Sequence, residues 1–86
     1  MYVIRYHKKV IKFIKKRVPK EKERILQRLE ELKKNPYPTN EHIDIKKLQA
    51  KNGYRLRIGD YRFLYDVEDK ALIIYMEDAD NRGDVY

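Results

Sequence analysis

The sequence predicts an α+β fold of order β-α-α-β-β-β, in which an N-terminal helical hairpin packs on one face of a mostly antiparallel four-stranded sheet. Between residues 8 and 34, apolar residues recur at helical spacing on both sides of one proline. After residue 53, three runs rich in β-branched and aromatic residues are separated by turn residues. The chain has 86 residues, enough for one modest core, so we expect a single domain over residues 1–86.

The N-terminal segment predicts one strand and two helices. "YVIRY", at residues 2–6, is β-branched and aromatic, which is typical of a strand. The first helix is predicted by four apolar residues at helical spacing, Val10, Ile11, Ile14 and Val18. Pro19 ends this helix because it lacks an amide donor, and it suits the first turn of the next one. The second helix, "KEKERILQRLEELKK", has an apolar stripe of Ile25, Leu26, Leu29 and Leu32.

A connector separates the helices from the remaining strands. "NPYPTN", at residues 35–40, holds two prolines and is expected to be a loop. "IDIKKLQAKNG", at residues 43–53, continues the connector, leaves room for a short strand near residues 45–48, and ends in an Asn52-Gly53 turn.

Three strands follow the connector. Residues 54–58 and 61–67 are joined by Gly59-Asp60, which predicts a hairpin with a two-residue turn. Residues 72–76 are apolar at every position, which is typical of a strand buried on both faces. The tail "DADNRGDVY", at residues 78–86, is too polar and too interrupted by glycine to predict a further element.

The composition excludes several kinds of site. The chain has no cysteine, so neither a disulfide nor a cysteine-ligated metal is possible. His7 and His42 lack the paired spacing of a metal site, so we expect no metal and no cofactor. No segment approaches about 18 consecutive apolar residues and the N-terminus has no signal-peptide pattern, so we expect a cytoplasmic protein without membrane contact.

Positive charge is concentrated in the first part of the chain. The net charge is +7 at pH 7. Residues 1–35 carry 13 basic and 4 acidic groups, whereas residues 63–86 carry 2 basic and 7 acidic groups. A basic body favours a polyanionic partner, and RNA or DNA is the obvious class.

The predicted hairpin places three arginines together. A two-residue turn pairs Arg57 with Arg62, and alternation puts Arg55 on the same face. Like charges directly opposite are destabilising by roughly 0.2–1 kcal/mol. The hairpin shows no carboxylate on this face before Asp66, and a guanidinium is a planar fork suited to phosphate. A solvated outer face is the alternative, but the pattern favours an anion site whose repulsion a bound phosphate relieves.

These residues carry a family resemblance. At "YRLRIGDYRFLYDV", preceded by "IKKLQAKNG" and followed by an apolar strand and "NRGDVY", the chain resembles the RelE/ParE toxin superfamily, on its RelE-like mRNA interferase branch. The resemblance runs nearly end to end, and the hairpin signature is its specific part. It implies the RelE-like microbial RNase fold. It also implies the toxin of a type II toxin–antitoxin system, neutralised by an acidic RelB-like antitoxin and contacting operator DNA only through that complex.

The resemblance further implies an activity. RelE-like members enter the ribosomal A site and cleave mRNA without a metal. The 2′-hydroxyl of the message attacks the adjacent phosphate and leaves a 2′,3′-cyclic end. The ribosome and mRNA are therefore implied partners, and inhibition of translation is the implied outcome.

Site residues follow by position within the family's motif. Arg62 matches the arginine that would stabilise the phosphorane. Arg82 would support the leaving group, and Tyr86 would orient or deprotonate the nucleophile. Arg55 and Arg57 match basic strand residues that contact phosphate. Three connector lysines complete the predicted RNA-binding set: Lys46, Lys47 and Lys51.

The sequence also departs from the family pattern. Asn81 stands where a titratable residue is frequent, and Gln49 stands where some relatives have arginine. Three acidic residues precede Arg82, namely Glu77, Asp78 and Asp80. Three hypotheses therefore stay open: a ribosome-dependent endoribonuclease, a ParE-type poison of DNA gyrase, and a catalytically degenerate toxin that binds antitoxin and operator DNA. All three imply an acidic antitoxin, because the helices are basic and a sheet edge could accept an added strand.

Overall fold

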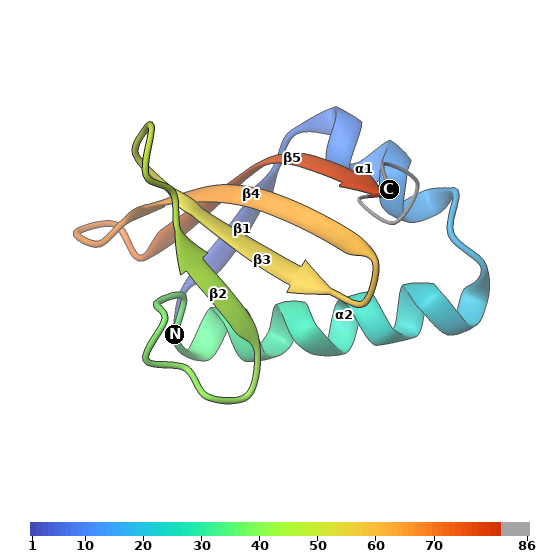
Figure 1. Ribbon diagram of the computed structural model, residues 1–86, viewed down its shortest axis with the longest axis horizontal. Coiled ribbons are helices and arrows are strands. Elements are labelled where there is room, and N and C mark those ends of the chain that lie inside the picture. The colour runs from blue at the N-terminus through green and yellow to red at the C-terminus, as the bar shows by residue number, and fades with distance from the viewer. Residues whose placement is uncertain (82–86) are drawn as a thin grey trace.

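The computed structural model describes residues 1–81. Arg82 and Tyr86, two of the predicted catalytic residues, lie outside the described residues. The elements in chain order are β1 (Val3–Tyr6), α1 (Lys8–Lys15), α2 (Pro19–Lys34), β2 (Asp44–Lys47), β3 (Tyr54–Ile58), β4 (Tyr61–Glu68) and β5 (Ile73–Asn81) (Figure 1).

Within residues 1–81, five strands form one sheet in the order β1-β5-β4-β3-β2. β1 runs parallel to β5, and every other neighbouring pair is antiparallel. The predicted α+β class with a mostly antiparallel sheet is confirmed. None of the helices in this part of the chain is long and apolar enough to cross a membrane.

Both helices pack on the same face of the sheet (Figure 1). Val10 of α1 and Ile25, Leu29 and Leu32 of α2 are buried there. The sheet contributes alternate residues to this core, namely Ile45, Leu56, Ile58, Phe63, Tyr65, Ile74 and Met76. Because alternation sends the residues between them to the other side, the opposite face carries the polar residues of the strands.

The fifth strand corrects the predicted count of four. β2 pairs antiparallel with β3, so that Ile45 lies opposite Leu56, and Ile45 is buried. Gly53, at φ +112°, turns the chain between the two strands. The short strand for which the connector left room near residues 45–48 is therefore present. It has a single buried position among charged residues and little apolar alternation, which explains why the count of four did not include it.

The last strand differs from the prediction in two ways. Residues 72–76 are not buried on both faces: Tyr75 is 41% exposed, because both helices lie on the other side. Leu72 lies before the strand at φ 55°. β5 also continues through the polar residues to Asn81, which lies opposite Tyr61 of β4. Backbone hydrogen bonding to β4 therefore extends β5 through residues 78–81, although the polar side chains of this segment do not predict a strand.

The helices also bury fewer residues than their apolar stripes predict. Pro19 begins α2 as predicted, but α1 ends at Lys15, and Val18 is the residue before α2. Val18 and Leu26 belong to the predicted apolar stripes but are 62% and 53% exposed, so they do not contribute to the core. Each helix contacts the sheet along one narrow side, and residues at the margin of a stripe remain in solvent.

A buried tyrosine joins the sheet to the proline loop. The hydroxyl of Tyr65 donates a hydrogen bond to the carbonyl oxygen of Pro36 at 2.6 Å, and both residues are buried. The Tyr54 ring stacks on Tyr65 with centroids 5.6 Å apart. Burial raises the pKa of the Tyr65 hydroxyl well above its ordinary value of 10.0.

We expect Tyr65→Phe to lower the free energy of unfolding by about 1 kcal/mol near pH 7, because the Pro36 carbonyl loses its partner. Since the folded pKa is raised, the unfolded chain releases this proton first, and the wild type loses stability as the pH rises past the ordinary tyrosine value. Phenylalanine has no hydroxyl to titrate, so the free energy of unfolding of the variant falls less at alkaline pH than that of the wild type. Urea unfolding at about pH 7 and about pH 10.5 measures both effects.

Tyr75→Phe is the matched control, because the same hydroxyl is removed from an exposed position on the other face. It is expected to unfold like the wild type at both pH values. An alkaline loss in Tyr65→Phe as large as that of the wild type would contradict the role given to this hydroxyl.

Candidate functional site

Three arginines of the β3–β4 hairpin lie on the side of the sheet away from the helices. Arg57 lies opposite Arg62, as the two-residue turn predicts, and Arg55 lies on the same face of β3. Leu56 and Phe63, which alternate with them, are completely buried on the helix side. We name the outward surface formed by Arg55, Arg57 and Arg62 the arginine face.

Neighbouring strands supply carboxylates to this face. Nη2 of Arg55 donates to Oδ1 of Asp44 on β2 at 2.8 Å, and Nη2 of Arg62 donates to Oδ2 of Asp80 on β5 at 2.8 Å. The expectation of arginines without carboxylates was therefore wrong for two of the three. The hairpin alone does not show these partners, because they come from the strands on either side of it. They offset the like-charge contact of Arg57 with Arg62.

Arg57 differs from the other two arginines. Its Nε donates to the carbonyl oxygen of Gly59 at 3.4 Å, and within residues 1–81 no carboxylate lies within 4.0 Å of its guanidinium. The side chain is exposed. Arg57 is thus the cation of this face most available to an external anion.

Several polar atoms of the arginine face lack partners. Nε of Arg55, Nε of Arg62 and Oδ1 of Asp80 are shielded from solvent and make no hydrogen bond to any described residue. Buried polar atoms without a partner are costly in a folded protein, and each one needs an explanation. The site combines donors that suit an anion with one acceptor that suits a hydroxyl.

The structure separates the three predicted lysines. Lys46 lies opposite Arg55 on the edge strand β2, so it adjoins the arginine face. The ammonium group of Lys47 lies 5.2 Å from the ring centroid of Tyr54, on the other side of the sheet. Lys51 lies in the loop between β2 and β3, at the end of the hairpin away from Arg57. Only Lys46 joins the arginines.

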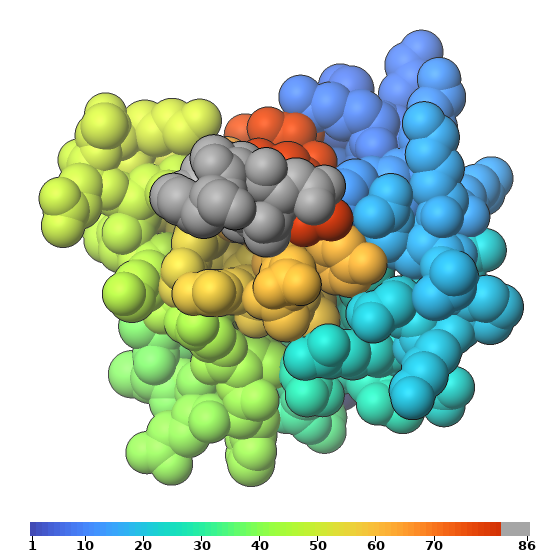
Figure 2. Space-filling view, turned by 45° about the vertical axis from the view of Figure 1, so that its right-hand side comes forward, coloured from blue at the N-terminus to red at the C-terminus, as the bar shows by residue number. Residues whose placement is uncertain are grey.

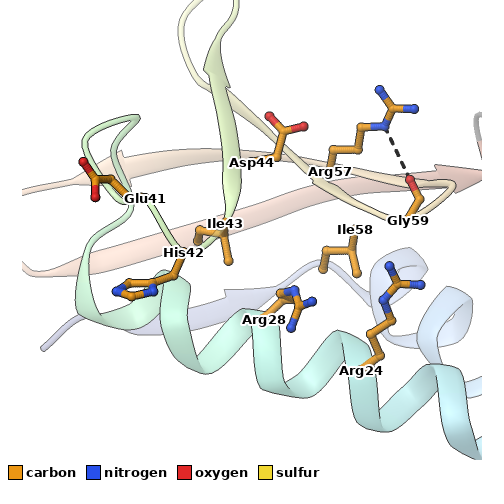
Figure 3. A pocket seen from close by; sticks show the side chains of 9 residues that line it. All are labelled: Arg24, Arg28, Glu41, His42, Ile43, Asp44, Arg57, Ile58 and Gly59. Atoms are coloured by element: carbon orange, nitrogen blue, oxygen red, sulfur yellow. Dashed lines mark hydrogen bonds between the residues drawn. The ribbon is translucent and has the colours of Figure 1, made fainter.

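Two arginines of α2 approach the hairpin and were missed by sequence reasoning. A groove of about 420 Å³ runs between α2 and the β3–β4 turn. Its lining residues are Arg24, Arg28, Glu41, His42, Ile43, Asp44, Arg57, Ile58 and Gly59 (Figure 3). Arg24 and Arg28 have the pattern of ordinary surface charges on a helix, and no local signal indicates that this part of α2 lies under the turn.

Comparison with known proteins places this chain in a family. The family described as "ParE toxin of type II toxin-antitoxin system" matches residues 2–77. The chain belongs to the RelE/ParE superfamily of type II toxins. The resemblance carried by the hairpin is thereby confirmed. Within the superfamily, this toxin is similar to RelE1 of Methanocaldococcus jannaschii, with 38% identity over 74 residues that cover 83% of this chain and 81% of RelE1.

Solved structures agree with this assignment. The toxin resembles the archaeal RelE–RelB complex from Pyrococcus horikoshii OT3 with 30% identity and a TM-score of 0.81, covering 95% of this chain and 96% of that one. It also resembles the RelB–RelE complex from Methanococcus jannaschii with 26% identity and a TM-score of 0.71, covering 94% of this chain and 93% of that one.

We expect Asp80→Asn to strengthen binding of this toxin to a polyanion, because Arg62 loses the carboxylate that occupies it. The measurement is the salt concentration at which the protein leaves a heparin column. Glu77→Gln is the matched control: it removes the same charge from the same strand, where the exposed Glu77 has no cation within 4.0 Å among residues 1–81. Elution of both variants at the same salt concentration would show that Asp80 does not screen Arg62.

Proposed function

We propose that this toxin is an endoribonuclease that cleaves mRNA in the ribosomal A site and thereby inhibits translation in the cytoplasm. The observation that carries the proposal is the arginine face, on which Arg62 lies between Arg57 and Asp80 in one cross-strand row. A row of guanidinium groups with an adjacent carboxylate suits a reaction at phosphorus that also needs a proton acceptor.

The reaction divides among the residues as follows. The 2′-hydroxyl oxygen attacks the adjacent phosphorus and gives up its proton, and the bond from phosphorus to the 5′-oxygen breaks. The products are a 2′,3′-cyclic phosphate and, once the leaving oxygen has taken a proton from water, a 5′-hydroxyl. Arg62 stabilises the negative charge of the phosphorane. Arg55 and Arg57 hold phosphate oxygens. Arg82 supports the leaving 5′-oxygen and Tyr86 orients the nucleophile, as the family resemblance implies.

A proton acceptor for the 2′-hydroxyl is needed, and the arginines cannot serve because a guanidinium keeps its proton in proteins. Asp80 contacts Arg62 through Oδ2, while its Oδ1 makes no hydrogen bond within residues 1–81. Asp80 is therefore the group that we assign to accept the 2′-hydroxyl proton, next to the Asn81 position where a titratable residue is absent.

An acidic antitoxin is the proposed partner. The solved relatives from Pyrococcus horikoshii and Methanococcus jannaschii are complexes of RelE with RelB. In this toxin the segment of residues 1–35 carries 13 basic groups, which favours an acidic chain. β2 lies at one edge of the sheet, where an added strand could pair with it. Contact with operator DNA would then occur through the antitoxin complex.

The first experiment uses the purified toxin without antitoxin, mixed with ribosomes stalled on a defined message. We expect primer extension to show cuts confined to the A-site codon. Arg62→Ala should slow cleavage by about 10²–10³-fold, because one donor to the phosphorane is lost. Lys47→Ala, which removes a positive charge from the other side of the sheet, is the matched control and should cleave like the wild type.

The remaining hypotheses predict different results. A gyrase poison, which the ParE name of the family favours, would give DNA breaks and intact mRNA in arrested cells. A degenerate toxin would bind ribosomes without cutting the message. Either result would overturn the nuclease proposal, and equal cleavage by wild type and Arg62→Ala would overturn the role of Arg62.

Asp80→Asn tests the proton acceptor separately. With Asp80 as the base, the wild-type cleavage rate between about pH 6 and pH 8 should not depend on hydroxide, because the carboxylate itself takes the proton. In the variant the rate should fall and then rise about tenfold per pH unit, since hydroxide must replace the base. Single-turnover cleavage on stalled ribosomes gives both rates, and Asp80→Glu should recover part of the loss.

Other roles of Asp80 would leave other signatures. If Asp80 only positions Arg62, the rate in Asp80→Asn falls but keeps the wild-type pH dependence. If Asp80 only screens Arg62, cleavage becomes faster in the variant. Both outcomes contradict a proton-accepting role.

A further inference from the structure

The groove between α2 and the β3–β4 turn is a second basic site beside the arginine face. We name it the α2 groove. Figure 3 shows Arg24 and Arg28 rising from α2 toward the turn, with Ile43 and Ile58 above them and Arg57 on the far side of Gly59. Figure 2 shows residues of this turn, in orange and yellow, directly against the blue-green residues of α2.

The packing of Arg24 against the turn depends on a glycine. A Cβ atom at position 59 would lie 2.8 Å from Nη1 of Arg24, so the guanidinium occupies the space that any other residue would fill. Gly59 is also at φ +59°, a conformation that glycine adopts without strain. Its carbonyl oxygen accepts a hydrogen bond from Nε of Arg57. One arginine therefore lies against Gly59 from each side of the sheet: Arg57 through a hydrogen bond, and Arg24 through close approach of its guanidinium.

The charges of the α2 groove are only partly compensated. Within residues 1–81, no carboxylate lies within 4.0 Å of the guanidinium of Arg28 or Arg57. Arg24 reaches Glu21 only at 4.0 Å, with both side chains partly exposed, and such pairs contribute little. Of the two acidic lining residues, Asp44 is engaged by Arg55. The groove thus offers several guanidinium donors against one further carboxylate, that of Glu41.

The α2 groove continues the arginine face. Arg57 belongs to both: it lies opposite Arg62 on the outer face, and it lines the groove. A chain of phosphates bound at Arg62 and passing Arg57 would reach Arg24 and Arg28 at the edge of the sheet. A single small anion does not need such a continuous row, whereas the backbone of an RNA strand does.

We propose that the α2 groove binds the phosphate backbone of the RNA substrate beside the cleaved bond. Arg24 and Arg28 hold phosphates and take no part in the chemical step. This inference rests on the proposed function in that the ligand is the same RNA. It adds a binding site on α2 that is separate from the reacting phosphate, and it makes the β3–β4 turn the point where the strand passes the sheet edge.

The test measures RNA binding without cleavage. The probe is a short fluorescent single-stranded RNA with 2′-O-methyl sugars, so that the 2′-oxygen cannot act as a nucleophile. Arg24→Gln with Arg28→Gln is expected to weaken binding at least tenfold, by anisotropy. The slope of log affinity against log salt should fall by about 1.4, because each phosphate contact on a single strand contributes about 0.7.

Lys20→Gln with Lys22→Gln is the matched control, since it removes two positive charges from the same helix at positions outside the α2 groove. Its affinity should stay within about twofold of the wild type by the same electrostatic argument. Arg24→Lys with Arg28→Lys keeps the charges and should retain most of the affinity. Thermal unfolding of all variants shows that each is folded at the assay temperature.

Failures of the two proposals are distinguishable. Groove-dependent binding by a toxin that cuts no mRNA would support the α2 groove and overturn the nuclease. A toxin that cuts mRNA, with equal binding in the arginine and lysine variants, would overturn the α2 groove alone. Absence of RNA binding by the wild type would also overturn it. In the cleavage assay, the arginine variant should raise KM and leave kcat unchanged, whereas Arg62→Ala lowers kcat.

Discussion

The register of the β3–β4 hairpin is the constraint on which the arginine face depends. Gly59 and Asp60 form a two-residue turn that places Arg57 opposite Arg62, a contact of like charges. A slip of one residue would separate the arginines, but it would turn the buried residues of the slipped strand, Leu56 of β3 or Phe63 of β4 among them, out of the core. Each large apolar side chain loses about 1.5–3 kcal/mol when it is moved into solvent. That loss exceeds the repulsion, so core packing holds the arginines together.

The order of the strands in the sheet then determines which carboxylates lie beside the arginines and reduce their mutual repulsion. β4 lies between β3 and β5, and β3 lies between β4 and β2, so the carboxylates of Asp80 and Asp44 reach the outer arginines of the hairpin. Arg57 is left between them without such a partner in the described part of the chain. The result is a face that is stable without a ligand and still presents a cation and unfilled donors to one.

The sequence predicted those features that depend on neighbours along the chain. Helical spacing located α2, and the turn residues set the register of Arg57 against Arg62. The sequence did not predict the carboxylate partners of the arginines. Asp44 and Asp80 come close to the hairpin arginines only because β2 and β5 lie on either side of the hairpin in the sheet. The same reason explains why Arg24, 35 residues before Gly59 in the chain, was missed. Local pattern indicates elements and faces, whereas long-range pairing decides which charges meet.

Five of the six described carboxylates in the acidic last third of the chain have a partner within the fold, although the acidity of this segment at first opposes the proposed RNA binding. Asp66 and Glu68 accept hydrogen bonds from backbone amides that follow them. Asp69 accepts the hydroxyls of Tyr2 and Tyr37, and these bonds lower the pKa of its carboxyl. Asp78 and Asp80 pair with Lys9 and Arg62. These carboxylates therefore serve turns, strand ends and arginine positions within the fold, and the basic helices and the arginine face remain the surfaces that an anionic partner can use.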